Sequence, residues 1–197
     1  WGDQLLIVYS REILKEKKGE KIIFDVKCSR ALEEEIEKYS GKPIMWKTGH
    51  SLIENKLHEE KAPIAGELSG HLYFADEYFG YDDAIYACLR LLRILDKEDK
   101  KLSEFFKDVK KYYSTPEIRI EVPDEEKFEI VERIKKYYSD KYKISDIDGV
   151  KVYYPDGWAL VRGSNTQPAL VVRVEAETEE ALNKIKGEFI EIIEKFK

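Results

Sequence analysis

The sequence predicts an α/β three-layer domain with a mostly parallel sheet, followed by a small α+β domain with an antiparallel sheet. In the first part, apolar strands alternate with amphipathic helices, which is the pattern of a parallel α/β sheet. In the second part, the order becomes strand, helix, three strands and helix, which favours an antiparallel sheet. Pattern and composition change between about Lys110 and Pro116, so we expect domains at 1–112 and 113–197.

The first domain opens with a helix over residues 4–18, where apolar residues recur at helical spacing before Gly19 ends the pattern. The run at 21–29 is apolar and β-branched without alternation, as in a strand covered on both faces. Ser29 is suited to cap the helix that follows. The remaining elements expected here are a helix at 29–41, a strand and loop at 43–51, a helix at 51–62, a strand at 65–74 and a helix at 79–97.

In the second domain, Ile118, Ile120 and Val122 alternate with polar residues, which predicts a half-buried strand at 117–123. An amphipathic helix at 124–140 is expected to start at an Asp cap. Three short strands joined by Asp-Gly turns follow within 144–176, and a final helix begins at the capping residue Thr178.

Acidic and basic residues nearly balance: 34 Lys and Arg against 40 Asp and Glu give a net charge of -6. This balance excludes a general electrostatic attraction to nucleic acid or to anionic membranes. The sequence contains no run of eighteen apolar residues and no signal-peptide pattern, so we expect a cytoplasmic protein. It begins with Trp1 and not with Met, and we therefore expect a piece of a longer protein.

The two cysteines, Cys28 and Cys88, lack the spacing of a metal site or of a disulfide framework, and both are expected to be buried thiols. Asp82 and Asp83 stand near the start of the helix at 79–97. We expect them to act as capping charges and not as metal ligands.

The stretch GELSGH, from Gly66 to His71, places a carboxylate, a hydroxyl and an imidazole in one short loop between glycines. Glu67 can accept hydrogen bonds from sugar hydroxyls, Ser69 can donate or accept, and His71 could move a proton. Such a loop suits a polyhydroxylated ligand, and a simple polar turn is the open alternative.

The stretch RGSNTQP, from Arg162 to Pro168, suits a phosphate group. A guanidinium can hold two phosphate oxygens, while two hydroxyls and exposed backbone N–H groups add short-range donors. We expect Gly163 to remove a side chain that would crowd the anion, and Asn165 to brace the loop. A plain turn is again the open alternative, but the two loops together predict a sugar phosphate as ligand.

Lys27 and His50 each follow a predicted parallel strand, and the GELSGH loop follows the third. Because the carboxyl ends of parallel strands meet at one edge of a sheet, we expect these residues to share a ligand site.

These loops resemble those of the α-D-phosphohexomutase superfamily, in particular the phosphomannomutase/phosphoglucomutase family. Its sugar loop reads GEMSGH and its phosphate loop reads RxSNTxP. The likeness extends through IIFDVKCSRAL, MWKTGHSLI, FGYDDAIYACLRLL and RVEAET. It implies that the chain is the C-terminal half of such an enzyme, formed by the third domain and a TBP-like fourth domain.

The resemblance also implies roles for individual residues. The sugar is expected to contact Lys27, His50, Glu67 and Ser69, and His71 is the candidate for proton transfer. The phosphate-binding residues implied are Arg162, Gly163, Ser164, Asn165 and Thr166.

By the same resemblance, the complete enzyme interconverts hexose 1-phosphates and hexose 6-phosphates of glucose and mannose. The reaction passes through a phosphoserine enzyme and a bisphosphorylated sugar, with Mg²⁺ as the metal and hexose 1,6-bisphosphate as intermediate. The family's serine loop and its DGDxDR metal loop have no counterpart here. We therefore expect no metal ligand in this chain and no catalysis without the missing N-terminal domains.

Two alternatives stay open. The chain could be a stand-alone sugar-phosphate-binding or regulatory module without catalysis. It could also belong to a mutase acting on glucosamine phosphate or N-acetylglucosamine phosphate. A nucleic-acid-binding role for the second domain is disfavoured by the acidic balance.

Overall fold

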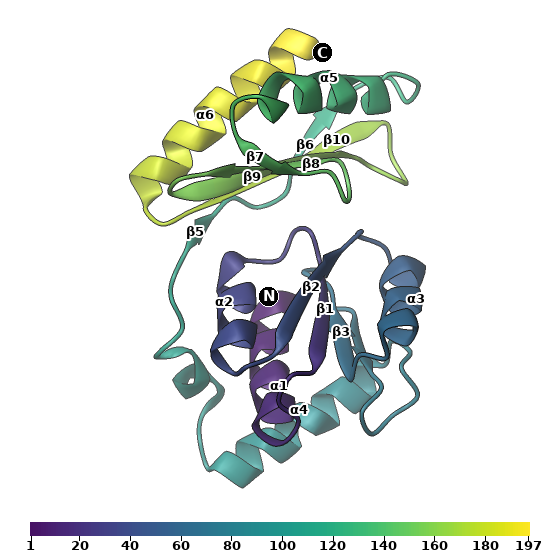
Figure 1. Cartoon of the computed structure of the whole chain (residues 1–197), viewed down its shortest axis with the longest axis vertical. Helices are drawn as coiled ribbons and strands as arrows, with labels where there is room; N and C mark the ends of the chain where they lie inside the picture. Colours follow the sequence, from purple (N-terminus) through teal and green to yellow (C-terminus); the bar gives the residue numbers. More distant parts are fainter. The chain divides into compact units, whose positions relative to one another are not determined.

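A computed structural model describes residues 1–197, and the chain divides into two compact units, Trp1–Lys110 and Lys111–Lys197. The elements of each unit are labelled in Figure 1. Each unit has its own sheet and its own helices, and the two are described separately below.

The sheet of the first unit is mixed, with three parallel strands and one antiparallel strand at the edge. Strand β1 pairs in parallel with β2 and with β3, and β3 pairs antiparallel with β4. The strands lie in the order β2 (Lys42–Trp46), β1 (Lys21–Asp25), β3 (Ile64–Gly66) and β4 (Leu72–Phe74). The mostly parallel sheet confirms the fold class predicted for this part of the sequence.

The expectation of one continuous strand at 65–74 is wrong, because the GELSGH segment turns the chain back on itself. The backbone N–H of Glu67 donates to the carbonyl of His71 at 2.9 Å, and that of Gly70 donates to the carbonyl of Glu67 at 3.0 Å. These two bonds close a tight turn, so β3 and β4 form a hairpin with the polar loop at its tip.

Helices cover both faces of this sheet and make the unit three-layered, as predicted (Figure 1). Helices α1 and α2 pack against each other on one face, while α3 contacts β1, β2 and β3 from the other. The side chain of Ser29 caps α2 by accepting from the backbone N–H of Ala31, which confirms the expected cap. The three helices span Gly2–Glu16 (α1), Arg30–Lys38 (α2) and His50–Glu60 (α3).

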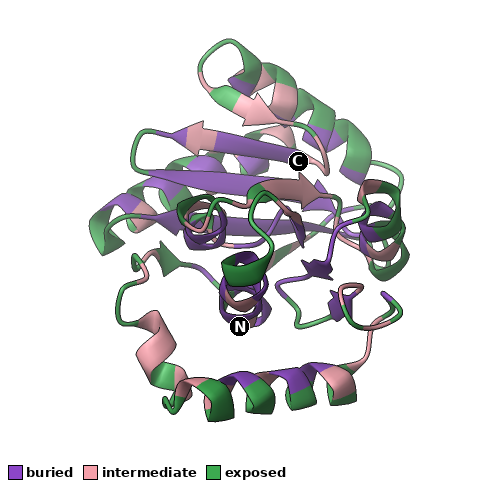
Figure 2. Ribbon diagram, turned by 60° about the horizontal axis from the view of Figure 1, so that its bottom comes forward, coloured by how far each residue is buried: buried purple, intermediate pink, exposed green.

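Helix α4 (Ala84–Glu98) is covered along a narrow stripe only. Asp83 caps it by accepting from the backbone N–H of Tyr86, as expected. Its buried residues are Ala87, Arg90 and Ile94, and Figure 2 shows the helix banded in buried and exposed colours. Cys88 lies outside the buried stripe and is exposed, so the expectation that both cysteines are buried is wrong for Cys88 and right for Cys28.

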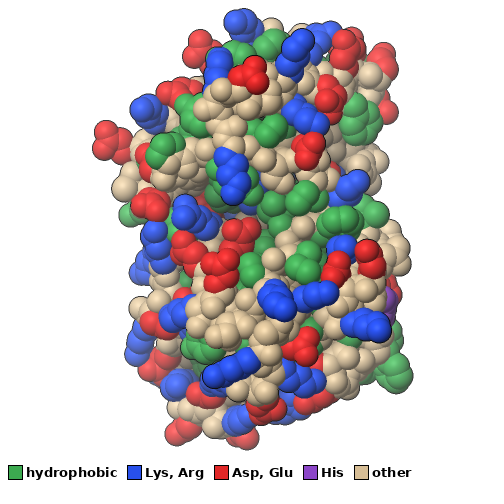
Figure 3. All heavy atoms as spheres, in the orientation of Figure 1, with side chains coloured by type: hydrophobic (Ala, Val, Ile, Leu, Met, Phe, Trp, Pro, Cys, Tyr) green, Lys and Arg blue, Asp and Glu red, His purple; other side chains and the backbone are tan.

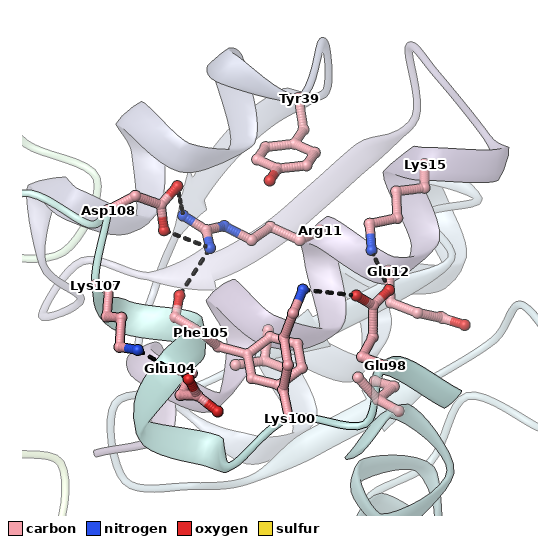
Figure 4. Close-up of a pocket in the computed structure, with 12 residues that line it drawn as sticks. Arg11, Glu12, Lys15, Tyr39, Glu98, Lys100, Glu104, Phe105, Lys107 and Asp108 are labelled. Atoms are coloured by element: carbon pink, nitrogen blue, oxygen red, sulfur yellow. Dashed lines mark hydrogen bonds and ion pairs between the residues drawn. The ribbon is translucent and has the colours of Figure 1, made fainter. Parts of the chain in front are cut away.

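A cluster of ion pairs joins a short 3-10 helix, η1 (Leu102–Phe106), to the rest of the first unit. It surrounds a surface pocket of about 390 Å³ beside α1 (Figure 4). Arg11 is at its centre and donates to the carbonyl of Phe105 and to the carboxylates of Glu35 and Asp108. The cationic side chains labelled in Figure 4 pair with acidic neighbours. We therefore interpret the charged residues around this pocket as a structural cluster of ion pairs.

The second unit is an antiparallel sheet with two helices on one face, which confirms the predicted α+β class. Strand β10 is central and pairs with β9, β5 and β6, and the sheet continues through β8 to β7. The strands are β5 (Tyr113–Ser114), β6 (Ile118–Glu121), β7 (Lys143–Ser145), β8 (Val150–Tyr154), β9 (Gly157–Gly163) and β10 (Ala169–Ala176). The helices are α5 (Lys127–Ser139) and α6 (Glu179–Phe196).

The core of the second unit lies between these helices and the sheet, and Phe189, Ile134 and Val172 are fully buried in it. Thr178 caps α6 by accepting from the backbone N–H of Ala181, as predicted. Strand β5 was not predicted, because a two-residue strand carries too little pattern to recognise. The segment expected to form three strands forms four, β7 to β10.

The expected Asp cap of α5 is wrong. The helix begins after Glu126, which makes no side-chain capping bond, while Asp124 accepts from the Lys127 ammonium.

Charges of both signs are interspersed over the face seen in Figure 3, as the balanced composition predicts. None of the helices combines the length and the apolarity needed to cross a bilayer.

Candidate functional site

The GELSGH loop presents its polar groups at different depths. Glu67 is buried, and the Tyr73 hydroxyl donates to one of its carboxylate oxygens at 3.1 Å. Burial, reinforced by the charge of Glu67, raises the pKa of Tyr73, so the phenol stays a donor at neutral pH. Ser69 and His71 are exposed. The loop thus holds a fixed carboxylate beneath an accessible hydroxyl and imidazole.

Two glycines make this loop possible. Gly70 adopts a φ of +101°, a conformation that L side chains rarely take. Gly2, at the start of α1, donates its backbone N–H to the carbonyl of Leu68 at 3.1 Å. A Cβ at Gly2 would come within 2.2 Å of the carbonyl oxygen of Glu67. The first turn of α1 can therefore lie directly against the loop and hold it.

Replacing Gly70 with alanine is expected to strain the loop by about 1–3 kcal/mol. A Cβ at this position would meet nothing within 4 Å, so the cost arises from the backbone alone. Urea unfolding measures it, with amides of the first unit reporting on Gly70→Ala and amides of the second unit reporting on the control variant. Gly187→Ala is the control, since that glycine is inside α6 with open space around it and should gain roughly 0.5–1 kcal/mol. If the two substitutions changed the unfolding free energy equally, the expected backbone strain at residue 70 would be contradicted.

The other sugar-site candidates of this unit lie at the same sheet edge. Lys27 follows β1, His50 follows β2 and the GELSGH loop follows β3. The ring of His50 is 5.5 Å from that of His71, and its Nδ1 is 3.7 Å from a carboxylate oxygen of Asp82. The three strand ends therefore gather cationic, carboxylate and imidazole groups at one edge, as the parallel topology predicts.

Asp25 supports this edge and was missed by the sequence reasoning. It is fully buried at the end of β1, where its carboxylate accepts from the backbone N–H of Lys27 at 2.9 Å. Burial raises the pKa of Asp25, the charge of Lys27 opposes the rise, and that of Glu67 adds to it. The sequence did contain a signal for this residue, namely an Asp within an otherwise apolar strand pattern. Its bond to Lys27 turns the chain, which is why β1 ends at Asp25 and not at 29.

Asp82 is not a capping charge, and that expectation is wrong. One of its carboxylate oxygens accepts from the backbone N–H of Leu72 at 3.1 Å, and the other is 2.7 Å from Nδ1 of His71. The sequence signal was the pair of acids at 82–83, because a helix has one N-cap and Asp83 occupies it. Asp82 thus orients the imidazole of His71.

The second candidate loop lies in the other unit, between β9 and β10, and it is internally bonded. The backbone N–H of Ser164 donates to the carbonyl of Ala169 at 2.9 Å. The Ser164 hydroxyl accepts from the backbone N–H groups of Thr166 and Gln167 at 3.3 and 3.2 Å. Asn165 and Thr166 are exposed at the tip. The loop is therefore preformed, with the side chains of Asn165 and Thr166 accessible and Ser164 buried.

Arg162, the last-but-one residue of β9, is held by an acidic partner. Its Nε donates to the carboxylate of Asp148 at 2.8 Å. Asp148 lies in the β7–β8 turn with Gly149, where a Cβ would come within 2.6 Å of the Arg162 side chain. The Asp146–Gly149 segment is thus a tight turn, as expected, and it orients the guanidinium of Arg162.

Gly163 also makes room within the protein, beside the role expected for it at the anion. A Cβ there would lie 3.0 Å from the ring of Phe128 and 3.4 Å from the Lys127 side chain. The missing side chain therefore lets the first turn of α5 approach β9.

Lys127 is a second residue that the sequence reasoning missed. Its buried ammonium donates to the carbonyl of Ser164 at 2.7 Å and to Asp124 at 2.6 Å. The sequence offered no signal, because a Lys near a helix start normally faces solvent. It connects α5 to the candidate phosphate loop.

Replacing Lys127 with methionine is expected to destabilise the second unit by about 1–3 kcal/mol, because the Ser164 carbonyl loses a charged donor. The amides of residues 164–167 should also exchange faster with solvent. Hydrogen exchange followed by NMR measures both effects. Lys136→Met, on the exposed face of the same helix, is the matched control and should change neither. Unchanged exchange in the loop of the Lys127 variant would contradict this role.

Comparison with known proteins identifies relatives of both units. Residues 1–112 match the family model described as phosphoglucomutase/phosphomannomutase, alpha/beta/alpha domain III. Residues 117–192 match the C-terminal domain of the same family. A phosphomannomutase/phosphoglucomutase of Pseudomonas syringae pv. tomato is 47% identical over 191 residues, which are 96% of this chain and 41% of the relative.

Solved structures agree with this result. A phosphoglucomutase/phosphomannomutase family protein from Burkholderia thailandensis superposes with a TM-score of 0.89 at 37% identity, over 98% of this chain and 41% of that one. An Aspergillus fumigatus N-acetylphosphoglucosamine mutase, solved with GlcNAc-6P and magnesium, has a TM-score of 0.75 at 14% identity over 99% of this chain and 44% of its own, a likeness of fold alone. The chain spans about two-fifths of these relatives' lengths.

Proposed function

The chain belongs to the phosphoglucomutase/phosphomannomutase family, and we propose that it is the sugar- and phosphate-recognising part of a hexose-phosphate mutase. The complete enzyme would interconvert hexose 1-phosphates and hexose 6-phosphates of glucose and mannose. The observation that carries the proposal is the pair of preformed loops, one with a fixed carboxylate and the other with a fixed guanidinium.

In the first unit, we assign recognition of the sugar hydroxyls to Glu67 and Ser69, with Lys27 and His50 as further contacts. Glu67 keeps one oxygen on the Tyr73 hydroxyl, which fixes the direction in which the other can accept. His71 is the proton-transfer group of the proposal. The carboxylate of Asp82 at its Nδ1 sets the tautomer and leaves Nε2 as the group that can exchange a proton with a sugar hydroxyl.

In the second unit, Arg162 through Thr166 hold the phosphate that does not react. The guanidinium supplies charge, the Ser164 and Thr166 hydroxyls donate to phosphate oxygens, and the Asn165 amide is exposed at the loop tip. If these residues hold the nonreacting phosphate while the first unit binds the sugar hydroxyls, either end of a bisphosphorylated sugar could be placed at the phosphoserine.

Mg²⁺ and hexose 1,6-bisphosphate belong to the proposal for the complete enzyme. The residues of this chain do not fit Mg²⁺, because the cluster that could hold a metal offers two imidazoles, whereas Mg²⁺ requires oxygen ligands. We therefore assign the Mg²⁺ and the phosphoserine to the N-terminal domains of the same polypeptide. A cytoplasmic location is part of the same proposal, since phosphorylated sugars are charged and do not cross membranes unaided.

Titration of the chain with glucose 1-phosphate and mannose 6-phosphate, followed by backbone NMR, tests these assignments. We expect weak binding, with shifts at residues 67–71 and at 162–167. Inorganic phosphate should shift the second set alone, and free glucose the first set alone. Hexose phosphates that perturb neither loop would refute the binding roles. Mutase turnover by the purified chain would refute the assignment of catalysis to the missing domains.

Assays of the complete polypeptide with glucose, mannose, glucosamine and N-acetylglucosamine phosphates distinguish the remaining substrates. Turnover restricted to the amino sugars would replace the proposed gluco/manno specificity. Absence of turnover with all four would favour the stand-alone binding module.

A further inference from the structure

We propose that His50, His71 and Asp82 form a binding site for a divalent transition metal ion, with Zn²⁺ as the best fit. The three come from separate elements: the start of α3, the end of the GELSGH loop and the segment before α4. The ligand atoms they offer all lie within 4.8 Å of one another. The sequence analysis expected no metal ligand in this chain, because the DGDxDR metal loop has no counterpart here.

The distances suit a single ion. Nδ1 of His71 and Nδ1 of His50 lie 2.7 and 3.7 Å from the same Asp82 oxygen. Ligands 2.0–2.2 Å from a tetrahedral Zn²⁺ are about 3.3 Å apart, a value between these two distances. The ligand atoms are at most 4.8 Å apart, so movements of up to about 1.5 Å, shared by two exposed imidazoles, would bring all three into a coordination sphere.

The surroundings orient two of the ligands for this task. Glu54 is 3.5 Å from Nε2 of His50, so its carboxylate can accept a hydrogen bond from Nε2–H and leave Nδ1 as the lone-pair donor. The backbone N–H of Leu72 holds the first Asp82 oxygen, and the second one remains directed at both imidazoles. Outer hydrogen bonds of this kind are typical of metal-binding His and Asp.

The ligand set selects the type of metal and leaves room for another group. Two imidazoles with one carboxylate suit Zn²⁺ and Co²⁺ and disfavour Mg²⁺ and Ca²⁺. Both imidazoles are about half exposed, with 52% and 48% of their side-chain surface accessible. Water or a sugar hydroxyl can therefore reach the fourth position.

One consequence rests on the proposed function. Nδ1 of His71 cannot both bind a metal and donate to Asp82, and His50 cannot both bind a metal and contact a sugar. Zn²⁺ should therefore compete with hexose phosphates and inhibit the complete enzyme at a site separate from that of Mg²⁺.

The chain contains three histidines, and this makes a direct test possible. In an NMR titration of the 197-residue chain with Zn²⁺, the ring Hε1 signals of His50 and His71 should shift and saturate at one equivalent. The signal of His58, at the other end of α3, should not move. Co²⁺ should give a visible absorption band with the same stoichiometry. A Cys88→Ser background removes the exposed thiol as a competing ligand.

Variants identify the ligands. His50→Ala, His71→Ala and Asp82→Asn should each weaken Zn²⁺ binding roughly tenfold or more, and His58→Ala should leave it unchanged. Asp82→Asn keeps an oxygen for the Leu72 N–H, and circular dichroism checks the fold of each variant. Binding that survives Asp82→Asn, or that is lost equally in His58→Ala, would overturn the site, as would the absence of any shift. No sugar is used, so failure of the proposed function leaves this test intact.

Discussion

Replacing Arg162 with alanine is expected to weaken hexose-phosphate recognition about 10- to 100-fold. Hydrogen bonds to charged groups contribute about 1.5–3 kcal/mol each, and every 1.4 kcal/mol is a factor of ten. The guanidinium is pre-oriented by Asp148 at 2.8 Å, so little ordering is needed when a phosphate binds. In the complete mutase kcat/KM should fall by that factor. In the isolated chain, phosphate-induced shifts at residues 164–166 should disappear.

Two further variants separate charge from geometry. Arg162→Lys keeps the charge but loses the planar guanidinium. Its affinity for hexose phosphates should therefore lie between that of the unmodified chain and that of Arg162→Ala. Arg133→Ala removes an exposed arginine of α5 that pairs with Glu129, and it should leave phosphate binding unchanged. If Arg162→Ala bound hexose phosphates as tightly as the unmodified chain, the phosphate-loop assignment would be wrong.

The sequence was informative where a residue's neighbours in the chain decide its structure. The caps at Ser29, Asp83 and Thr178 were predicted because each bonds an N–H two or three residues away. The clustering of strand ends was predicted because parallel topology follows from alternation of strands and helices.

The sequence was uninformative where the decisive partner is distant. The bond from Lys127 to the Ser164 carbonyl spans 37 positions, and the close approach of Phe128 to Gly163 depends on how α5 packs. The local sequence pattern contains no sign of this bond or of this close approach. Cys88 was misjudged for the same reason, since an apolar helix shows which residues could be buried, while the packing of α4 decides which are.

The acidic pair at 82–83 illustrates both cases. Asp83 follows a local rule, whereas Asp82 is positioned by β4 and the GELSGH loop, through Leu72 and His71. Only the fold brings Asp82 to His50 and His71, and the candidate metal site therefore depends on tertiary structure that spacing does not show.

Replacing Arg11 with alanine is expected to have the largest effect on stability, about 3–5 kcal/mol in the first unit. Arg11 is buried beside the buried carboxylate of Glu35, and it also holds the Phe105 carbonyl at 2.7 Å. Alanine would leave Glu35 with the half-exposed Lys38 as its remaining basic partner and would release η1 from α1. At 4–8 °C per kcal/mol, the melting temperature of this unit should fall by more than about 10 °C.

The same cluster adds a pH dependence with a defined sign. Lys38, together with Arg11, lowers the pKa of Asp108 to about 2. A lowered carboxyl pKa stabilises the fold above its unfolded value near 4, and this contribution is lost as the pH falls towards 2. Since Asp108 is half exposed, its share is small. Through Asp108, acid should therefore narrow the difference in unfolding free energy between the unmodified chain and Arg11→Ala only slightly.

We attribute the expected loss of stability in Arg11→Ala to the buried charge that it leaves uncompensated, and not to the number of ion pairs that it removes. Two variants distinguish these two causes. Lys15→Ala removes a partly exposed pair with Glu98 in the same cluster and should cost less than about 1 kcal/mol. Adding Glu35→Gln to Arg11→Ala removes the uncompensated carboxylate and should recover part of the loss. Amide signals of β1 report the first unit during urea unfolding, and those of β9 serve as an internal reference. Similar losses for Lys15→Ala and Arg11→Ala would contradict this explanation.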